Sequence, residues 1–130
     1  METRRVLLID DEVGFTKLVK LNLEKTGRYT VRVENSGGQA LAAAREFQPE
    51  LILLDIVMPG KDGGEVLAEL QTNPATQRIP VAFLTATVST KGVADRGNRI
   101  HGLPFIAKPV SPQELIGEIE SILKGKNERR

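Results

Sequence analysis

The sequence predicts an α/β fold in which a parallel β-sheet is covered by helices on both faces. Short apolar runs alternate with segments of helical periodicity along the chain. Two of these runs, residues 6–9 and 51–54, are apolar at every position. Strands without polar positions are buried on both faces, which is typical of parallel sheets that lie between two helical layers.

Five strands are expected from these patterns. The second of them alternates apolar and polar residues, as an outer strand with one wet face does. The fifth is the shortest. The expected strands cover residues 6–9, 29–33, 51–54, 80–84 and 105–107.

Five helices are expected to alternate with the strands, and three of them have a signal at their first turn. An N-cap residue followed three positions later by Glu or Gln forms a capping box. The pairs are Ser36 with Gln39, Asp62 with Glu65, and Ser111 with Glu114.

The first helix is expected to end at Gly27. A weaker helical pattern covers roughly residues 89–98, and the last helix has an apolar stripe from Leu115 to Leu123. In the first helix, the side chains expected in the core are Phe15, Leu18, Val19 and Leu23.

The composition fits one domain, because 40% of the 130 residues are hydrophobic. Lys and Arg number 18 against 17 Asp and Glu, and this balance gives no reason to expect nucleic acid or an anionic membrane as a direct partner. The chain has no cysteine, which excludes disulfides and thiolate metal sites. No apolar run approaches the roughly 20 residues that cross a bilayer, so we expect a cytoplasmic protein. The domain is expected over residues 1–124, followed by a basic tail or the start of a linker over 125–130.

Five polar residues come directly after predicted strands. In open parallel sheets, ligands bind outside the carboxyl ends of the strands, so these side chains are expected to converge at one edge. The first strand is followed by Asp10 and Asp11, the third by Asp55, the fourth by Thr85 and the fifth by Lys108.

This set of residues indicates a metal and a phosphoryl group. Three neighbouring carboxylates repel one another and need a cation or raised pKa values. Oxygen ligands without His or Cys suit a hard ion such as Mg²⁺. The metal, Lys108 and the Thr85 hydroxyl would together neutralise a phosphoryl group carried by one carboxylate. Each residue alone also fits a plain structural role, as a cap, a turn, a strand position or a solvated charge, but their joint placement favours the functional interpretation.

Four blocks of the sequence resemble the signature blocks of receiver domains of bacterial response regulators. They are residues 9–12, 55–63, 84–86 and 105–109, and the resemblance extends from about residue 6 to residue 123. It implies a flavodoxin-like, doubly wound α/β fold. This fold has a five-stranded parallel sheet with strand order 2-1-3-4-5 and five helices.

The resemblance implies phosphorylation and metal binding by the acidic residues. Asp55 would be the phosphoacceptor. Asp10 and Asp11 would bind Mg²⁺ (or Mn²⁺) together with Asp55 and the backbone carbonyl of Val57. Because the Val57 side chain is apolar and cannot orient a water molecule, we expect a long-lived phosphoaspartate.

The resemblance also implies which residues respond to phosphorylation. Thr85, the backbone of Ala86 and Lys108 would bind the phosphoryl group, and the peptide from Lys108 to Pro109 would be cis. Phe105 would be an aromatic switch that turns inward when Thr85 moves, with a plain core residue as the alternative. The output face would consist of the fourth helix, the fifth strand and the fifth helix.

The implied function is two-component signal transduction by a phosphoacceptor rather than an enzyme. Such a domain catalyses only its own phosphorylation from a donor and its own dephosphorylation. The donor would be a sensor histidine kinase or a phosphotransfer protein, because the only histidine, His101, has no acidic or metal-ligand company. The output would pass to an effector protein or a fused output domain. Residues 114–120 lack the arginines through which one subgroup of regulators dimerises, so a monomer or weak dimer is expected.

Three alternatives fit less well. A phosphatase of the haloacid-dehalogenase type needs a second acid two residues after its nucleophile, where this chain has Val57. A flavin-binding flavodoxin needs a phosphate loop rich in Ser, Thr and Gly after the first strand, where this chain has three acids. A receiver that is never phosphorylated is disfavoured, because all five site positions carry the expected residue types. The segment 100–105 departs from the usual receiver pattern, so we expect an unusual corner before the fifth strand.

Overall fold

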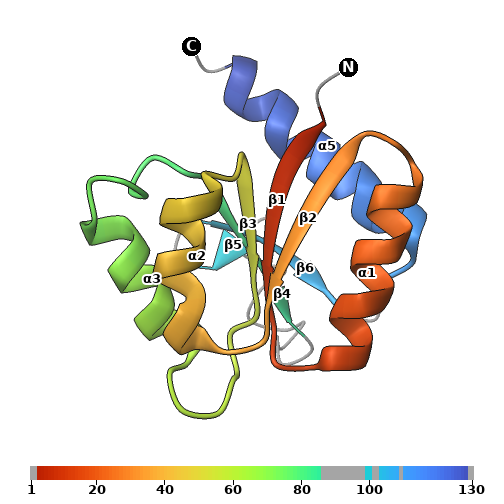
Figure 1. Ribbon diagram of the computed structural model, residues 1–130. Coiled ribbons are helices and arrows are strands. Elements are labelled where there is room, and N and C mark those ends of the chain that lie inside the picture. Colours follow the sequence, from red (N-terminus) through yellow and green to blue (C-terminus); the bar gives the residue numbers. More distant parts are fainter. Residues whose placement is uncertain (1–2, 86–98, 101–102, 109, 129–130) are drawn as a thin grey trace.

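The structure is a computed structural model that describes residues 3–85, 99–100, 103–108 and 110–128. A twisted sheet lies between two helical layers (Figure 1). Helices α1 (Val13–Lys25) and α5 (Pro112–Glu128) cover one face, and α2 (Ala40–Phe47) and α3 (Gly63–Thr72) cover the other. This is the α/β architecture that the alternating pattern predicts.

Among the described residues, the sheet has six strands in the order β2-β1-β3-β4-β6-β5. The first five strands in this order are parallel to one another. They confirm the predicted order 2-1-3-4-5, with β6 as the predicted fifth strand. The strand bounds are β1 (Arg4–Ile9), β2 (Tyr29–Glu34), β3 (Leu51–Leu54), β4 (Val81–Thr85), β5 (Arg99–Ile100) and β6 (Leu103–Ala107).

The short strand β5 is not among the predicted strands. It pairs antiparallel with β6, with Ile100 opposite Leu103. This pairing lies in the segment 100–105, where an unusual corner was expected. The helix expected at 89–98 lies outside the described residues, within which there are four α-helices.

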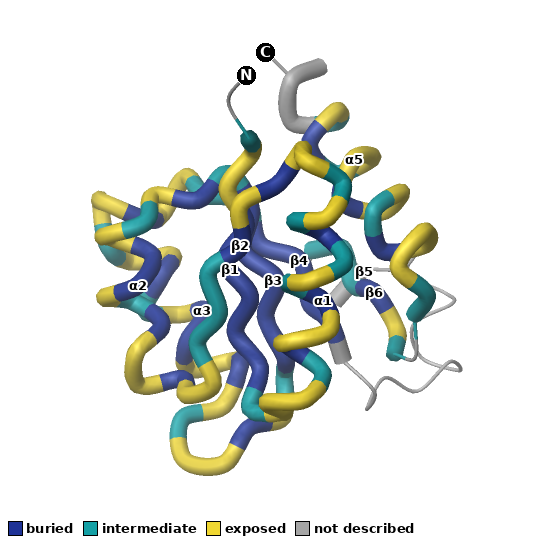
Figure 2. The backbone as a smooth tube through the Cα atoms, turned by 45° about the vertical axis from the view of Figure 1, so that its right-hand side comes forward, coloured by how far each residue is buried: buried dark blue, intermediate teal, exposed yellow. Residues whose placement is uncertain are grey.

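Both faces of β1 are buried, as its apolar sequence predicts (Figure 2). Val6 and Leu8 point into the core under α1 and α5, and Leu7 and Ile9 point into the core under α2 and α3. Successive side chains of a strand point to opposite faces, so a single run of four apolar residues supplies both cores. Between its neighbours β2 and β3, the carboxyl end of β1 is thus held at the sheet edge by packing on both faces.

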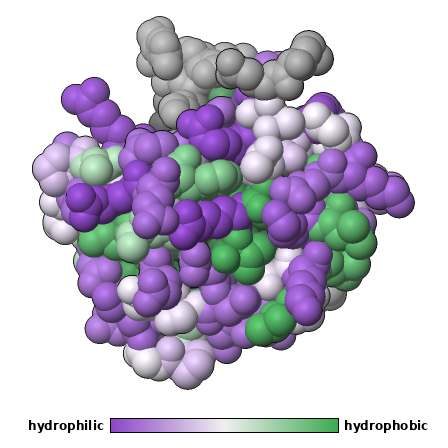
Figure 3. Space-filling view, viewed as in Figure 1, coloured by the Kyte–Doolittle hydropathy of each residue, from purple (hydrophilic) through white to green (hydrophobic). Residues whose placement is uncertain are grey.

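The prediction is wrong for one of the four side chains of α1 that were expected in the core. Leu18 is 57% exposed, whereas Val19 and Leu23 are buried and Phe15 is partly buried. The buried stripe instead includes Thr16, which lies three and seven positions before Val19 and Leu23, the spacing of one helix face. Apolar surface is accordingly visible among polar side chains on the α1 side of the molecule (Figure 3).

Two of the three expected capping boxes are confirmed. Asp62 and Glu65 exchange both hydrogen bonds at the start of α3, and Ser111 and Glu114 do so at the start of α5. The box expected at Ser36 is wrong, because its hydroxyl accepts from the amide of Gly38 at 3.2 Å and caps a single 3₁₀ turn, η1 (Gly37–Gln39). Helix α2 follows this turn and begins at Ala40.

The carboxyl end of the domain remains helical beyond the predicted boundary. Helix α5 runs to Glu128, four residues past Lys124. Its stripe is confirmed, since Leu115, Ile119 and Leu123 are buried. No helix in the part of the chain that the structure describes is long and apolar enough to cross a membrane.

Candidate functional site

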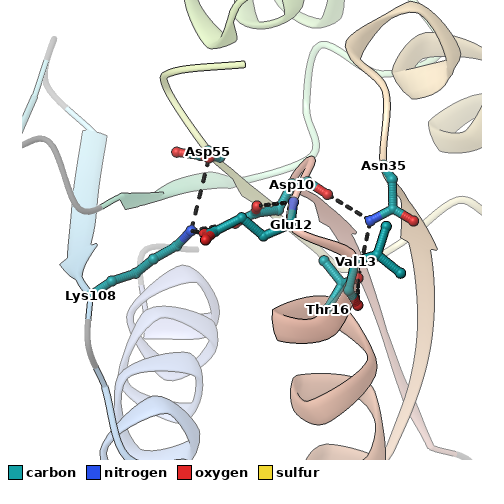
Figure 4. A network of polar contacts seen from close by, with 7 residues as sticks. All are labelled: Asp10, Glu12, Val13, Thr16, Asn35, Asp55 and Lys108. Atoms are coloured by element: carbon teal, nitrogen blue, oxygen red, sulfur yellow. Dashed lines mark hydrogen bonds and ion pairs between the residues drawn. The ribbon is translucent and has the colours of Figure 1, made fainter. Parts of the chain in front are cut away.

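The carboxyl ends of three inner strands of the sheet bring charged side chains together, at the lower edge of the sheet in Figure 1. Asp10 follows β1, Asp55 follows β3 and Lys108 follows β6. In the close-up, the three side chains point toward one another (Figure 4). Asp10 and Asp55 are 0% and 6% exposed, so both carboxyl groups have been removed from water. Burial of this kind needs compensation by partners or by a bound cation.

The acidic residues form a cluster whose geometry fits a metal ion. One carboxylate oxygen each from Asp10, Asp11 and Asp55 lies within 4.8 Å of the others. Asp10 Oδ1 accepts a hydrogen bond from the amide of Glu12 at 2.9 Å, but Asp10 Oδ2 is buried and has no hydrogen-bond partner. Three clustered carboxylates, two of them buried, with no His or Cys are suited to Mg²⁺ or Mn²⁺. The residues therefore fit the predicted ion.

The Lys108 ammonium compensates part of the negative charge. Its Nζ lies 2.6 Å from Asp10 Oδ2, in an ion pair without hydrogen-bond geometry, and 3.9 Å from Asp55 Oδ2. Its hydrogen bond goes to Glu12 Oε1 at 2.7 Å, and the ring of Phe15 lies 4.4 Å away. Burial alone would lower the pKa of Lys108, but the neighbouring Asp10 and Glu12 carboxylates outweigh it, so the pKa is raised. Lys108 thus carries its charge at neutral pH.

Asp55 is in an environment that disfavours its own charge. Its pKa is raised, first because the carboxyl group is buried and then because the charge of Asp10 is close. The ammonium of Lys108 and a hydrogen bond from the backbone of Val57 oppose these effects without cancelling them. A cation held between the two aspartates would favour the ionised carboxylate, which is the form that attacks phosphorus.

Glycines shape the loop that carries Asp55. A Cβ atom on Gly63 would lie 2.5 Å from the carbonyl oxygen of Asp55 and 2.6 Å from Cα of Ile56, so only glycine fits there. The amide of Gly63 donates to the carbonyl of Ile56 at 2.8 Å, and Gly60 has a φ of +78°. In the same loop the apolar side chain of Val57 is 56% exposed.

The predicted site residues fall into three groups. Asp10, Asp11, Asp55 and Lys108 are brought together, and Val57 lies in the adjoining loop. Phe105 is partly buried against the core under α2 and α3, and the backbone of Thr85 pairs with Ala107. Ala86 and Pro109, and with Pro109 the predicted cis peptide, lie outside the described residues.

Two contacts of Lys108 were not predicted. Glu12 accepts its hydrogen bond, and Phe15 contacts its ammonium with the ring face. The signal for Glu12 was its place directly after Asp10 and Asp11, but its partner lies 96 residues away in the sequence. The sequence marks Phe15 only as an apolar residue in the helical pattern of α1. Such a pattern predicts burial but not contact with a cation.

The fold and this site define an α/β domain with clustered acidic residues and a buried lysine at the carboxyl ends of its strands, and comparison with known proteins identifies its family. The family model described as response regulator receiver domain matches residues 6–120. The chain therefore belongs to the response regulator receiver domain family of two-component systems.

Curated relatives agree with this assignment. Protein PilH of Pseudomonas aeruginosa is 35% identical over 123 residues, which are 93% of this chain and 98% of PilH. The phosphate regulon transcriptional regulatory protein PhoB of the same organism is 35% identical over 129 residues, or 95% of this chain and 53% of PhoB. The chain thus spans nearly all of PilH but about half the length of PhoB.

Solved structures show the same fold. A CheY-like response regulator receiver domain protein from Methanospirillum hungatei matches 99% of this chain and 100% of its own, with a TM-score of 0.81 and 26% identity. A response regulator from Desulfuromonas acetoxidans matches 93% of this chain and 97% of its own, with a TM-score of 0.79 and 28% identity.

Proposed function

We propose that this receiver domain accepts a phosphoryl group on Asp55 and passes the signal on by a change of shape. The observation that carries the proposal is the position of the Asp55 carboxylate, 3.9 Å from the Lys108 ammonium and within 4.8 Å of the Asp10 and Asp11 oxygens. The oxygens of an acyl phosphate formed there would be neutralised by the Lys108 ammonium and by a cation held between the carboxylates.

The proposed metal site consists of Asp10, Asp11, Asp55 and the backbone carbonyl of Val57. Mg²⁺ or Mn²⁺ bound there would neutralise the negative charge of the phosphoryl oxygens. Asp10 would offer Oδ2, which pairs with Lys108 in this structure, because its other oxygen already accepts a hydrogen bond from the amide of Glu12.

The chain's own residues supply the remaining chemistry. A carboxylate oxygen of Asp55 forms the new P–O bond while the bond from phosphorus to the donor breaks. Lys108 then exchanges its hydrogen bond to Glu12 for one to a phosphoryl oxygen. The Thr85 hydroxyl and the backbone of Ala86 complete the phosphoryl contacts, and Phe105 follows Thr85 inward.

The domain acts on itself and does not turn over an external substrate. Its phosphoryl donor is a sensor histidine kinase or a phosphotransfer protein, and its output is the surface around β6 and α5. The chain matches nearly the whole length of PilH, which supports output through a separate effector protein. It matches about half of PhoB, which supports output through a fused domain. The exposed, apolar Val57 orients no water molecule, which supports a long-lived phosphoaspartate.

The experiment is intact-mass spectrometry after incubation with acetyl phosphate, with and without Mg²⁺. The wild type is expected to gain one phosphoryl group only with Mg²⁺, and Asp55→Asn none. The matched control is Asp62→Asn, which removes a carboxylate from the same loop but keeps an N-cap residue for α3. A phosphoryl group on Asp55→Asn, or none on the wild type with either acetyl phosphate or a kinase, would contradict the proposal.

A further inference from the structure

The residue after β2 holds the loop that carries Asp10 and Asp11. The side-chain amide of Asn35 donates one hydrogen bond to the backbone carbonyl of Asp10 at 2.7 Å and another to Thr16 Oγ1 at 3.0 Å (Figure 4). The Thr16 hydroxyl in turn donates to the carbonyl of Val13 at 3.0 Å. Thr16 is buried. Asn35 therefore ties the end of β1 to the first turn of α1 across the loop between them.

Two residues later, the same segment contacts the loop that carries Asp55 and Val57. A Cβ atom on Gly37 would lie 2.5 Å from the backbone oxygen of Lys61 and 3.0 Å from a methyl group of Val66. Gly37 is buried, and its φ is not in the left-handed region. The requirement for glycine is thus one of space, because the backbone of this turn lies directly against the loop between β3 and α3.

We propose that residues 35–37 are a positioning segment that sets the distance between the two acidic loops and so prepares the metal site. This inference rests on the proposed function, but it concerns residues to which that function assigns no contact with metal or phosphoryl group. Asn35 fixes one loop through hydrogen bonds, and Gly37 fixes the other by close contact.

Repulsion within the site explains why such a segment is needed. Three carboxylates whose oxygens lie within 4.8 Å of one another push their loops apart when no cation is bound. Lys108 offsets only part of this charge, and it is shared with Glu12. A loop held in place before the ion arrives loses less conformational freedom on binding, which gives tighter binding.

The test is Mn²⁺ affinity of the full chain, measured by electron paramagnetic resonance of the free ion. Asn35→Ala and Gly37→Ala are each expected to weaken Mn²⁺ binding about tenfold, the size of effect typical of residues that orient metal ligands. Thr16→Val, which keeps the shape of the side chain but removes the acceptor for Asn35, is expected to weaken binding by a smaller factor.

Two matched controls are available in the chain. Gly38→Ala lies next to Gly37, but its Cβ would come no closer than 3.6 Å, to Ser36 Oγ. Asn22→Ala makes the same exchange at a half-buried position of α1. Both are expected to bind Mn²⁺ as the wild type does.

Thermal unfolding in EDTA separates positioning from stability, since every affinity is measured where the variant is fully folded. Normal Mn²⁺ affinity in folded Asn35→Ala and Thr16→Val would overturn the inference, even if both were less stable. If Gly37→Ala does not fold, the Mn²⁺ affinities of Asn35→Ala and Thr16→Val still test the inference. The wild type separates this inference from the proposed function: Mn²⁺ binding without phosphoryl uptake would refute the function and leave the positioning test valid.

Discussion

The two acidic loops of the site are held in place by different physical means. The loop between β1 and α1 is fixed by hydrogen bonds, from the Asn35 amide to the Asp10 carbonyl and from the Glu12 amide to Asp10 Oδ1. The loop between β3 and α3 is fixed by close packing at two glycines that leave no room for a Cβ atom. Gly63 lies within the loop, and Gly37 packs against it from the segment after β2. The first loop is therefore sensitive to lost donors and acceptors, and the second to added atoms.

The largest effect is expected from filling the space at Gly63. In Gly63→Ala the new Cβ would meet the backbone of Asp55 and Ile56, which cannot move away as a flexible side chain can. We expect a loss of about 3 kcal/mol in the free energy of unfolding, measured by urea denaturation. The control is Gly64→Ala in the first turn of α3, where the nearest atom is Asp62 Oδ1 at 3.4 Å, and where alanine should be neutral or stabilising. Equal stability of the two variants would show that the loop adapts.

Metal removal is the next largest effect, because an ion between Asp10, Asp11 and Asp55 would join the two loops. At 100 times its dissociation constant, Mg²⁺ should add about 2.7 kcal/mol to the free energy of unfolding relative to EDTA. Asp11→Asn should abolish most of this gain, and Asp62→Asn should keep it. Urea denaturation with and without Mg²⁺ measures this stabilisation. If Mg²⁺ stabilised Asp11→Asn as much as the wild type, the ion would bind elsewhere.

The raised pKa of Asp55 predicts a pH dependence of the metal-free protein. Burial and the charge of Asp10 raise it above the ordinary value of 3.8, so the folded protein holds this proton more tightly than the unfolded chain does. The ionised Asp55 therefore costs stability at neutral pH, and this cost disappears as the pH falls through the raised pKa. In EDTA, Asp55→Asn should be more stable than the wild type at neutral pH, with a difference that shrinks on acidification. A difference that grows on acidification would refute this account of the site.

The smallest effect is expected at Glu12, whose side chain is 61% exposed. Its carboxylate holds the Lys108 ammonium by a hydrogen bond and so competes with a phosphoryl oxygen for Lys108. Exposed pairs contribute at most about 1 kcal/mol, so Glu12→Gln should accelerate phosphoryl uptake from acetyl phosphate by about fivefold or less. Glu69→Gln removes the ion pair with Lys61 beside the other acidic loop and should leave the rate unchanged. A slower rate in Glu12→Gln would mean that Glu12 holds Lys108 in its productive position.

Most of the fold was predictable because burial leaves a direct mark on the sequence. The apolar run of β1 requires two covered faces, and the cap pairs at Asp62 and Ser111 mark where α3 and α5 begin. Leu18 was misplaced because an apolar residue beside the buried stripe of α1 fits the pattern nearly as well as one within it. The two-residue strand β5 is too short to have any periodicity.

The charged residues of the site were predictable for a topological reason, since Asp10, Asp55 and Lys108 each follow a strand. Their neighbours were not. Asn35 reaches the Asp10 carbonyl across 25 residues of sequence, and the space that requires glycine at position 37 is defined by Lys61 and Val66. Such contacts depend on how two loops approach each other, which no local pattern encodes.

The central claim is that this site accepts a phosphoryl group on Asp55, and borohydride reduction of the phosphorylated chain tests it most directly. Borohydride converts an aspartyl phosphate to homoserine, and peptide mass spectrometry then locates the changed residue. The account predicts homoserine at position 55 alone, and only in samples phosphorylated with Mg²⁺ present. Homoserine at position 10, 11 or 62, or a phosphorylated chain with Asp55 unreduced, would contradict it.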